Sequence, residues 1–325
     1  MNTLSILALY EIPNVGQRAV EKVLSLSLSS EPQNPSDLID ILKKANDAYG
    51  RVSIPNNDDA EVGWNKAQEI WQLSQQNGIQ IISRESPSYP KYLLQIPDPP
   101  VLLHVKGNID AMNKDCIAIV GTREPTNYGY NAGRKLGEIF AKEGYVIVSG
   151  LAEGIDTAAH LGALDANGIT VAVLAHGLDT IFPSKNKELS DIILRNNGTL
   201  ISEYPWGTNG NKGYFIARDR IQSGLSLGVF VVETDISGGA MHTAKFCRNQ
   251  NRGLIVLQHP ENLRGHLKTF GNENLISNGE ADIIFEDDND VDVVKIKMNQ
   301  IKNSLLNSQK DKKDVQKSKL QMTLD

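Results

Sequence analysis

The sequence of 325 residues lacks most features of secreted, membrane-spanning or metal-binding proteins. Its two cysteines, Cys116 and Cys247, are far apart and have no metal-site spacing, so we expect free, buried thiols in a reducing compartment. No stretch approaches the ~20 apolar residues that are needed to cross a bilayer. The N-terminus has neither a basic n-region nor a small-residue cleavage site, and we expect mature sequence there. These absences favour a cytoplasmic protein without a membrane partner.

The chain also lacks an excess of positive charge, since its formal net charge is −6. Residues 286–294 contain five acids and no base, whereas residues 295–325 contain eight lysines against three aspartates. A uniformly basic surface is therefore excluded, and a nucleic-acid site would have to be a local groove. Residues 287–325 have few large apolar side chains, and we expect a polar, lysine-rich, poorly ordered tail.

Apolar residues recur at helical spacing in residues 1–80, which predicts a small all-helical domain. Within it, "IPNVGQRAVEKVLS" (residues 12–25) predicts a turn before an amphipathic helix. Such a turn can direct backbone N–H groups at a phosphate, as in a SAM-like or helix-hairpin-helix domain, or it can be a plain corner between packed helices. Residues 81–112 are rich in proline and then resemble a strand, so we expect an extended lead-in to a sheet.

Strand-like and helix-like segments alternate over residues 113–286. Near-continuous apolar runs such as "CIAIVGT", "YVIVSG" and "GVFVVET" are separated by helix-length segments such as "YNAGRKLGEIFAKEG". Buried strands joined by helices predict a parallel sheet that is covered on both faces. The expected fold class is therefore α/β, with a Rossmann-like, doubly wound, mostly parallel sheet that follows the helical N-terminal domain.

Glycine and hydroxyl side chains gather where these strands end, at the edge where ligands of such sheets bind. The residues concerned are Gly121, Thr122 and Arg123; Ser149, Gly150 and Gly154; His176 and Gly177; and Ser237, Gly238 and Gly239. Four such turns at one sheet edge predict a cradle for an anion. There is no G-x-G-x-x-G fingerprint and no P-loop, which disfavours a dinucleotide or ATP site. We expect no cofactor and no metal, and we expect Arg123 to offer its fork of donors to a phosphate.

Eight motifs in order, from about Tyr89 to Asp282, resemble the DNA-processing protein A family (DprA, also called Smf). They are "YPKYLLQIPDPPVLLHVKGN", "IAIVGTREPTNYGYNAG", "VIVSGLAEGIDTAAHLGAL", "GITVAVLAHGLDTIFPSKNKEL", "LISEYPWG", "FIARDRIQSGLS", "VFVVETDISGGAMHTA" and "GNENLISNG". The family's usual F-P-x-R-N-R reads "FIARDR" here, so that Ile216 and Asp219 replace proline and asparagine. Its usual S-G-S-L-I-T-A reads "SGGAMHTA". The chain therefore resembles a divergent member.

The resemblance implies a Rossmann-like domain that binds single-stranded DNA through backbone phosphates without sequence preference. It also implies a homodimer that helps to load the recombinase RecA during natural transformation and recombination. It places Gly121, Thr122 and Arg123 on one phosphate-binding turn, and Ser149, Gly150, Leu151, Ala152, Gly154, Ile155 and Asp156 on a second. It places Lys212, Phe215, Arg218 and Arg220 on the segment that contacts DNA backbone and bases. With Ser237, Gly238 and Gly239, these residues form the predicted site.

A catalytic interpretation competes with binding. Asp156 and His160 are four residues apart, on one face of a helix, and Glu203, Glu233 and His242 lie near predicted strand ends or helix starts. We find no nucleophile paired with a base, so we expect no enzyme. The alternative is a nucleotide glycosidic-bond hydrolase, but its P-G-G-x-G-T-x-x-E signature is absent. A third possibility is a scaffold with a vestigial groove whose N-terminal helices bind a partner.

A single-strand site also needs stacking faces for DNA bases. Phe215 is the first candidate, with Tyr214 or Trp206 as others, because single-strand binding needs aromatic faces beside positive charge. Phe215 is equally compatible with a place in the core.

Overall fold

The computed structural model describes residues 1–28 and 30–322, with side chains described as far as residue 308. A single nine-stranded sheet has the order β1-β2-β6-β5-β4-β3-β7-β8-β9. Its strands are β1 Ile79–Ser83, β2 Leu102–Gly107, β3 Cys116–Val120, β4 Val146–Ser149, β5 Thr170–Leu174, β6 Thr199–Ser202, β7 Gly228–Val231, β8 Gly253–Leu257 and β9 Ile283–Phe285. The strands from β6 to β9 in this order run parallel, whereas β2 is antiparallel to both β1 and β6.

Successive side chains of the central strands pack into two separate cores, one on each face of the sheet. In β3, Ala118 and Val120 pack on one face and Ile117 and Ile119 on the other. The helices α5 Asn127–Lys142, α6 Ile155–Asp165, α7 Lys187–Arg195 and α11 Val291–Met322 cover one face, and α8 Lys212–Leu225, α9 Gly239–Asn249 and α10 Phe270–Ser277 cover the other. Helices on both faces of a mostly parallel sheet confirm the predicted doubly wound α/β fold.

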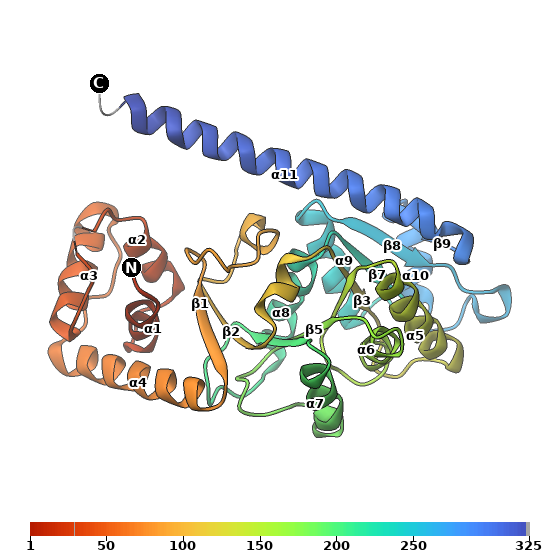
Figure 1. Cartoon of the computed structure of the whole chain (residues 1–325), viewed down its shortest axis with the longest axis horizontal. Helices are drawn as coiled ribbons and strands as arrows, with labels where there is room; N and C mark the ends of the chain where they lie inside the picture. The colour runs from red at the N-terminus through yellow and green to blue at the C-terminus, as the bar shows by residue number, and fades with distance from the viewer. Residues whose placement is uncertain (29, 323–325) are drawn as a thin grey trace.

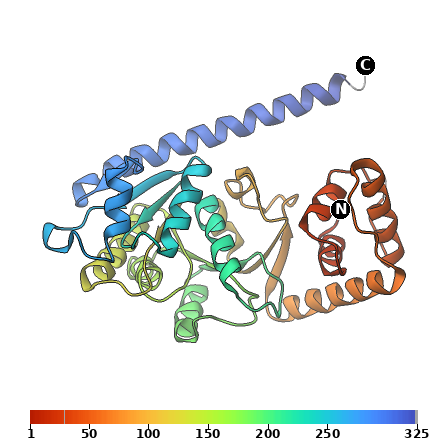
Figure 2. The same ribbon diagram turned by 180° about the vertical axis from the view of Figure 1, so that it is seen from behind.

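The N-terminal helices form a second unit at one end of the molecule, far from β9 and α10 (Figures 1 and 2). They are α1 Thr3–Glu11, α2 Gln17–Leu24, α3 Pro35–Tyr49 and α4 Asn57–Gln76. Asn2, Asn34 and Asn56 cap three of them, each with a side chain that accepts a backbone N–H of the first turn. The helical N-terminal domain expected from the sequence is therefore present.

The segment expected to be a lead-in contributes two strands to the sheet itself. β1 and β2 pair antiparallel, and β2 continues the sheet through β6. Ile81, Val101 and Leu102 belong to the core of the N-terminal helices, so this hairpin joins the two units. Short 3-10 turns complete the fold at η1 Leu93–Gln95, η2 Ile109–Asn113, η3 Ser184–Asn186, η4 Glu261–Leu263 and η5 Asp288–Asp290.

The expectation of a poorly ordered tail is wrong for its first half. Residues 291–322 form one helix, α11, which lies along the molecule in Figure 1. Val294 and Met298 are fully buried against the sheet and Leu305 is nearly so. Apolar residues at helical spacing anchor this part despite the surrounding charge. Residues 323–325 of the predicted tail lie outside the described residues.

Among the described helices, none has both the length and the apolar character that a bilayer span requires.

Candidate nucleic-acid interface

The predicted site lies where the chain reverses its direction across the sheet. From β3 the chain moves through β4, β5 and β6 on one side and then returns to place β7 on the other side of β3. Ligands of open α/β sheets bind at this switch point, outside the carboxyl ends of the strands. A cavity opens there, which we call the central groove. Its lining comprises Val120, Gly121, Thr122, Arg123, Glu124, Ala152, Asp156, Phe215, Ile216, Arg218, Asp219, Gln222, Asp235, Gly238, Gly239, Ala240, His242, Thr243 and Lys268.

Glu233 fixes the position of the loop after β3 through hydrogen bonds. The backbone N–H of Thr122 donates to the Glu233 carbonyl oxygen at 2.7 Å. The backbone N–H and the hydroxyl of Thr126 donate to the buried Glu233 carboxylate at 2.7 and 2.6 Å. Burial raises the pKa of this carboxyl, but hydrogen bonds and the nearby His259 outweigh burial and hold the pKa below its usual value. The loop that carries Arg123 is thus preorganised.

Arg123 projects into the groove and is exposed. Its guanidinium carbon lies 5.3 Å from the ring centroid of Phe215, within cation–π range. No acid among the described residues forms an ion pair with it. The Phe215 ring packs at 5.9 Å from Phe182, which is 55% exposed. Phe215 is therefore a partly exposed groove residue, not a core residue.

The loop after β4 supports the groove more than it lines it. Ser149 is buried, and its hydroxyl donates to the Ile119 carbonyl at 2.7 Å. Leu151 is also buried and has a φ of 60°, a conformation that is uncommon for a residue with a side chain. Gly154 has a φ of 81°, and a Cβ atom there would lie 2.4 Å from the Thr122 carbonyl oxygen. Only a glycine allows the two loops to approach so closely.

Asp156 and Asp219 place two buried carboxyl groups in the groove floor. Asp156 accepts the backbone N–H groups of Gly150 and Ala152 at 3.1 and 3.3 Å, and burial raises its pKa. Asp219 forms an ion pair with Arg218 at 3.1 Å. Burial, reinforced by Asp156, raises the pKa of Asp219 to about 7, although Arg218 opposes the shift. At Asp219, where the family motif usually has asparagine, the structure therefore places a carboxyl group against Arg218.

The start of α9 brings unpaired backbone donors to the groove. Gly238 is the N-cap residue of this helix, and no side chain caps it. A helix N-terminus with free N–H groups attracts anions, because these donors and the helix dipole both favour negative charge. Lys268 also lines the groove, and its ammonium donates to the Glu124 carbonyl oxygen in the loop after β3. No local pattern in the sequence marks Lys268 or Gln222, and only the tertiary fold brings them to the groove. The same is true of Phe182, which lines a smaller cavity beside the groove together with Arg123 and Phe215.

Several predicted residues do not line the central groove. Arg220 follows Arg218 by two positions, about 200° around α8, and it points to the opposite side of the helix. There its guanidinium donates to Asp98 at 2.9 Å and to Glu203 at 2.6 Å. Lys212 is exposed at the first residue of α8. The remaining predicted residues outside the lining are Ser149, Gly150, Leu151, Gly154, Ile155 and Ser237. Two of the other candidates also lie outside it, namely His176 and Gly177.

The candidate acid–base pair is not assembled. His160 is fully buried, and its Nδ1 lies 2.6 Å from the Thr170 hydroxyl; no described hydrogen bond joins it to Asp156. Burial lowers the pKa of His160 to about 3, so the ring is neutral and out of reach of a ligand. Glu203 is engaged by Arg220, and Glu233 by Thr126. These four side chains serve packing and loop positioning.

Comparison with known proteins places most of the chain in one family. The family model described as DNA recombination-mediator protein A matches residues 80–295. Protein Smf of Synechocystis sp. is 40% identical over 216 residues, which are 65% of this chain and 53% of that protein. DNA processing protein DprA of Streptococcus pneumoniae is 41% identical over 169 residues, 52% of this chain and 59% of that one. The matches span about half the length of these relatives.

Two solved structures resemble large parts of this fold. The structure of DNA processing protein A from Streptococcus pneumoniae matches with a TM-score of 0.72 and 29% identity, covering 88% of this chain and 95% of that one. DNA processing protein A from Helicobacter pylori, a structure described by its single-stranded DNA binding mode, matches with a TM-score of 0.55 and 29% identity. That match covers 72% of this chain and 96% of the other.

Proposed function

The chain belongs to the DNA recombination-mediator protein A family, and we propose that it binds single-stranded DNA in the central groove without cleaving it. The observation that supports this most directly is the exposed Arg123 guanidinium over the Phe215 ring, opposite the uncapped start of α9. This arrangement offers a phosphate a charged fork and backbone donors, and it offers a base an aromatic face. The similar Helicobacter pylori protein is described as binding single-stranded DNA.

The groove fits one strand and not a duplex. Its lining combines loops at the sheet edge with residues of α8 and α9, so it is a recess and not a protruding recognition helix of the kind that enters a major groove. Arg123, Arg218 and Lys268 bring positive charge to its lining. Of the acids there, Asp156 and Asp219 are buried and held by protein partners, and Glu124 and Asp235 are exposed. We therefore expect the protein to prefer single-stranded DNA to a blunt duplex of equal length, with little dependence on sequence.

Substitution of Arg123 tests this function. Arg123→Ala should weaken binding of a labelled oligonucleotide, measured by fluorescence anisotropy, by ~1.5–3 kcal/mol, the range for a hydrogen bond to a charged group. It should also reduce the slope of log affinity against log salt by ~0.7, the share of one phosphate on a single strand. Arg123→Lys should restore only part of the affinity, because lysine keeps the charge but loses the bidentate fork.

Arg195→Ala is the charge-matched control. Arg195 is exposed at the end of α7, so its substitution removes the same charge outside the groove. Its affinity should match that of the wild type. A folded Arg123→Ala protein with unchanged affinity and salt slope would show that the groove does not hold DNA.

The wider role extends this proposal. The family relationship supports a homodimer that delivers single-stranded DNA to a RecA-type recombinase during transformation or recombination. Sedimentation analysis with and without an oligonucleotide tests the dimer, and RecA filament formation on coated DNA tests the delivery step. A monomer at all concentrations, or no effect on RecA filaments, would contradict the respective part.

A further inference from the structure

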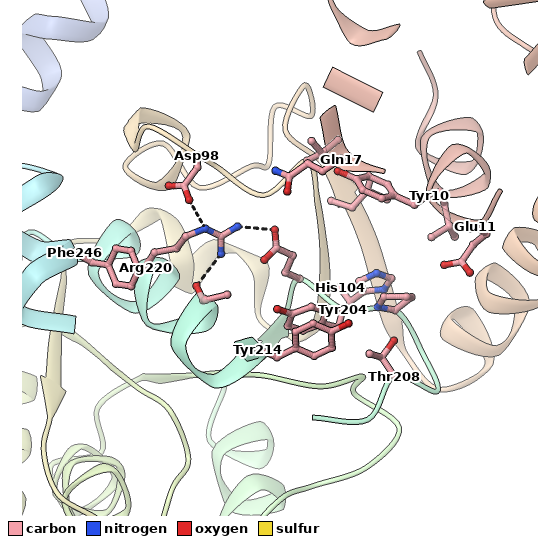
Figure 3. Close-up of a pocket in the computed structure, with 16 residues that line it drawn as sticks. Tyr10, Glu11, Gln17, Asp98, His104, Tyr204, Thr208, Tyr214, Arg220 and Phe246 are labelled. Atoms are coloured by element: carbon pink, nitrogen blue, oxygen red, sulfur yellow. Dashed lines mark hydrogen bonds and ion pairs between the residues drawn. The ribbon is translucent and has the colours of Figure 1, made fainter. Parts of the chain in front are cut away.

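A second cavity, of about 680 Å³, lies between the N-terminal helices and the sheet domain. Figure 3 shows side chains from both units facing this space. Helix α8 separates it from the central groove: Tyr214, Ala217 and Arg220 face the cavity, and Phe215 and Arg218 face the groove. We call it the interdomain cavity. It shares no lining residue with the central groove, although Tyr214 and Arg220, which the sequence placed in the DNA site, line it.

The charged groups of the interdomain cavity leave one negative charge unbalanced. Arg220 donates to both Asp98 and Glu203, so a single guanidinium serves two carboxylates (Figure 3). The remaining acid in the lining, Glu11, is paired with Lys66 at 2.6 Å. Only Oε1 of Glu203 takes part in the described hydrogen bonds, so its second oxygen remains able to accept. An anionic ligand would be repelled here, and a cationic one attracted.

Aromatic faces line the same space. The rings of Tyr204 and Tyr214 stack with centroids 4.0 Å apart and 22° between their planes. Tyr10 faces them from α1. Burial raises the pKa of both Tyr10 and Tyr204, and the negative charge of Glu203 adds to the shift, so both hydroxyl groups are neutral. Aromatic rings beside an unbalanced carboxylate are the usual surroundings of a bound organic cation.

His104 is a buried polar side chain in this lining, and one of its ring nitrogens is unsatisfied. It is 2% exposed, and its Nδ1 atom has no hydrogen-bond partner among the described residues. Burial lowers the pKa of His104 to about 4, so the ring is neutral and keeps one nitrogen as an acceptor. An unsatisfied buried polar group is uncommon and calls for an explanation. Here the unpartnered nitrogen is enclosed by protein, so it makes the cavity wall polar without being open to a ligand.

We propose that the interdomain cavity binds a small organic monocation, of the ammonium, amidinium or guanidinium class. The cation lies against the Tyr204 and Tyr214 rings, and its N–H groups donate to the Glu203 carboxylate. A molecule that carries a phosphate is excluded by the unbalanced carboxylate. This site is independent of DNA binding in the central groove.

Three molecules of nearly the same size and shape test the charge requirement. Benzamidine is cationic, benzamide is neutral and benzoate is anionic at pH 7.5. In titrations of the full-length protein by calorimetry and ligand-observed NMR, benzamidine should bind at least ten times more tightly than benzamide, and benzoate should not bind. Equal binding of benzamidine and benzamide, or no binding of benzamidine, would overturn the proposal.

Two substitutions locate the binding. Glu203→Gln should abolish the preference for benzamidine over benzamide. Because that change also removes a partner of Arg220, Ala217→Phe serves as a second variant that fills the cavity from α8 and should reduce benzamidine affinity at least tenfold. Glu188→Gln, on the exposed face of α7, is the matched control and should bind as the wild type does. Unchanged benzamidine affinity in a folded Ala217→Phe protein would place the binding elsewhere and overturn the proposal.

Discussion

At the scale of single residues, Asp219 is the group whose ionisation is most closely linked to the central groove. It is 8% exposed, pairs with Arg218 and lies near Asp156 and Arg123. Because its pKa is raised to about 7, its charge changes near neutral pH. A phosphate that enters the groove favours the protonated, neutral form. Binding should therefore be accompanied by proton uptake whenever the free protein has Asp219 ionised.

Asp219→Asn should make DNA binding less dependent on pH. In the wild type, affinity for single-stranded DNA should decrease as pH rises from 6 to 8, because Asp219 becomes a nearby negative charge. In Asp219→Asn this decrease should be smaller, and affinity at pH 8 should rise by on the order of fivefold, equivalent to about 1 kcal/mol. Anisotropy titrations at constant ionic strength measure both values. A wild-type affinity that stays constant over this range would contradict the assignment.

Glu233 acts through the loop that it holds. Its folded-state pKa lies below the usual value, so its contribution to stability is present above that usual value and is lost as pH falls through the folded-state pKa. Glu233→Gln should lower the free energy of unfolding by about 1–3 kcal/mol, the cost of an unsatisfied buried group. It should also flatten the acid limb of the stability curve, measured by urea denaturation between pH 3 and 7. Identical acid limbs would show that Glu233 does not carry this dependence.

At the scale of elements, α11 illustrates how a charged segment can still be part of the core. Met298 lies over Gly228 of β7 and Gly253 of β8, where an added Cβ atom would come within 2.7 Å of its side chain. The two glycines leave the space that this methionine fills. Val294 and Leu305 are buried on the same side of the helix. The first half of α11 therefore covers this part of the sheet.

Met298→Ala should reduce the free energy of unfolding by roughly 2–5 kcal/mol, since it leaves a cavity above the two glycines. Thermal and urea denaturation measure the loss. Lys295→Ala, in the same helix but outside the core, is the control. It should change stability by less than about 1 kcal/mol, because its ion pairs with Glu143 and Asp292 are at the surface and partly exposed. Equal effects of the two substitutions would mean that α11 does not pack as described.

At the scale of the whole molecule, the N-terminal helices and the sheet are not independent. Ile81, Val101 and Leu102 belong to the sheet hairpin, yet they are buried in the core of the helices. Removing the helices would expose these side chains, each at a cost of roughly 1.5–3 kcal/mol. The two units therefore stabilise each other.

A chain that starts at residue 77 should have a lower melting temperature than the full chain and should aggregate on heating. Differential scanning calorimetry and light scattering measure these effects. A variant of this shortened chain with Val101→Thr and Leu102→Gln should aggregate less, because the newly exposed apolar surface is reduced. A shortened chain as stable and soluble as the full one would show that the helices contribute nothing to the sheet.

The sequence by itself determined those features that depend on local patterns. Apolar runs and helical spacing predicted the strands β3 to β9 in outline, the helices between them and the helical N-terminus, because burial follows the period of each element. Motifs in order along the chain predicted the family. The residues at the strand ends predicted where a groove forms, because parallel strands bring their carboxyl ends to one edge.

Only the tertiary structure decided which of these residues face the groove. Arg218 and Arg220 belong to one motif, yet they are two positions apart on a helix, so their side chains point to opposite sides. Arg218 pairs with Asp219, whereas Arg220 pairs with Glu203. The packing of α11 could not be predicted from the sequence for a similar reason. Its apolar positions are few, and they are buried only because Gly228 and Gly253, distant in sequence, leave room for Met298. Exposure and pairing depend on neighbours that a linear pattern does not contain.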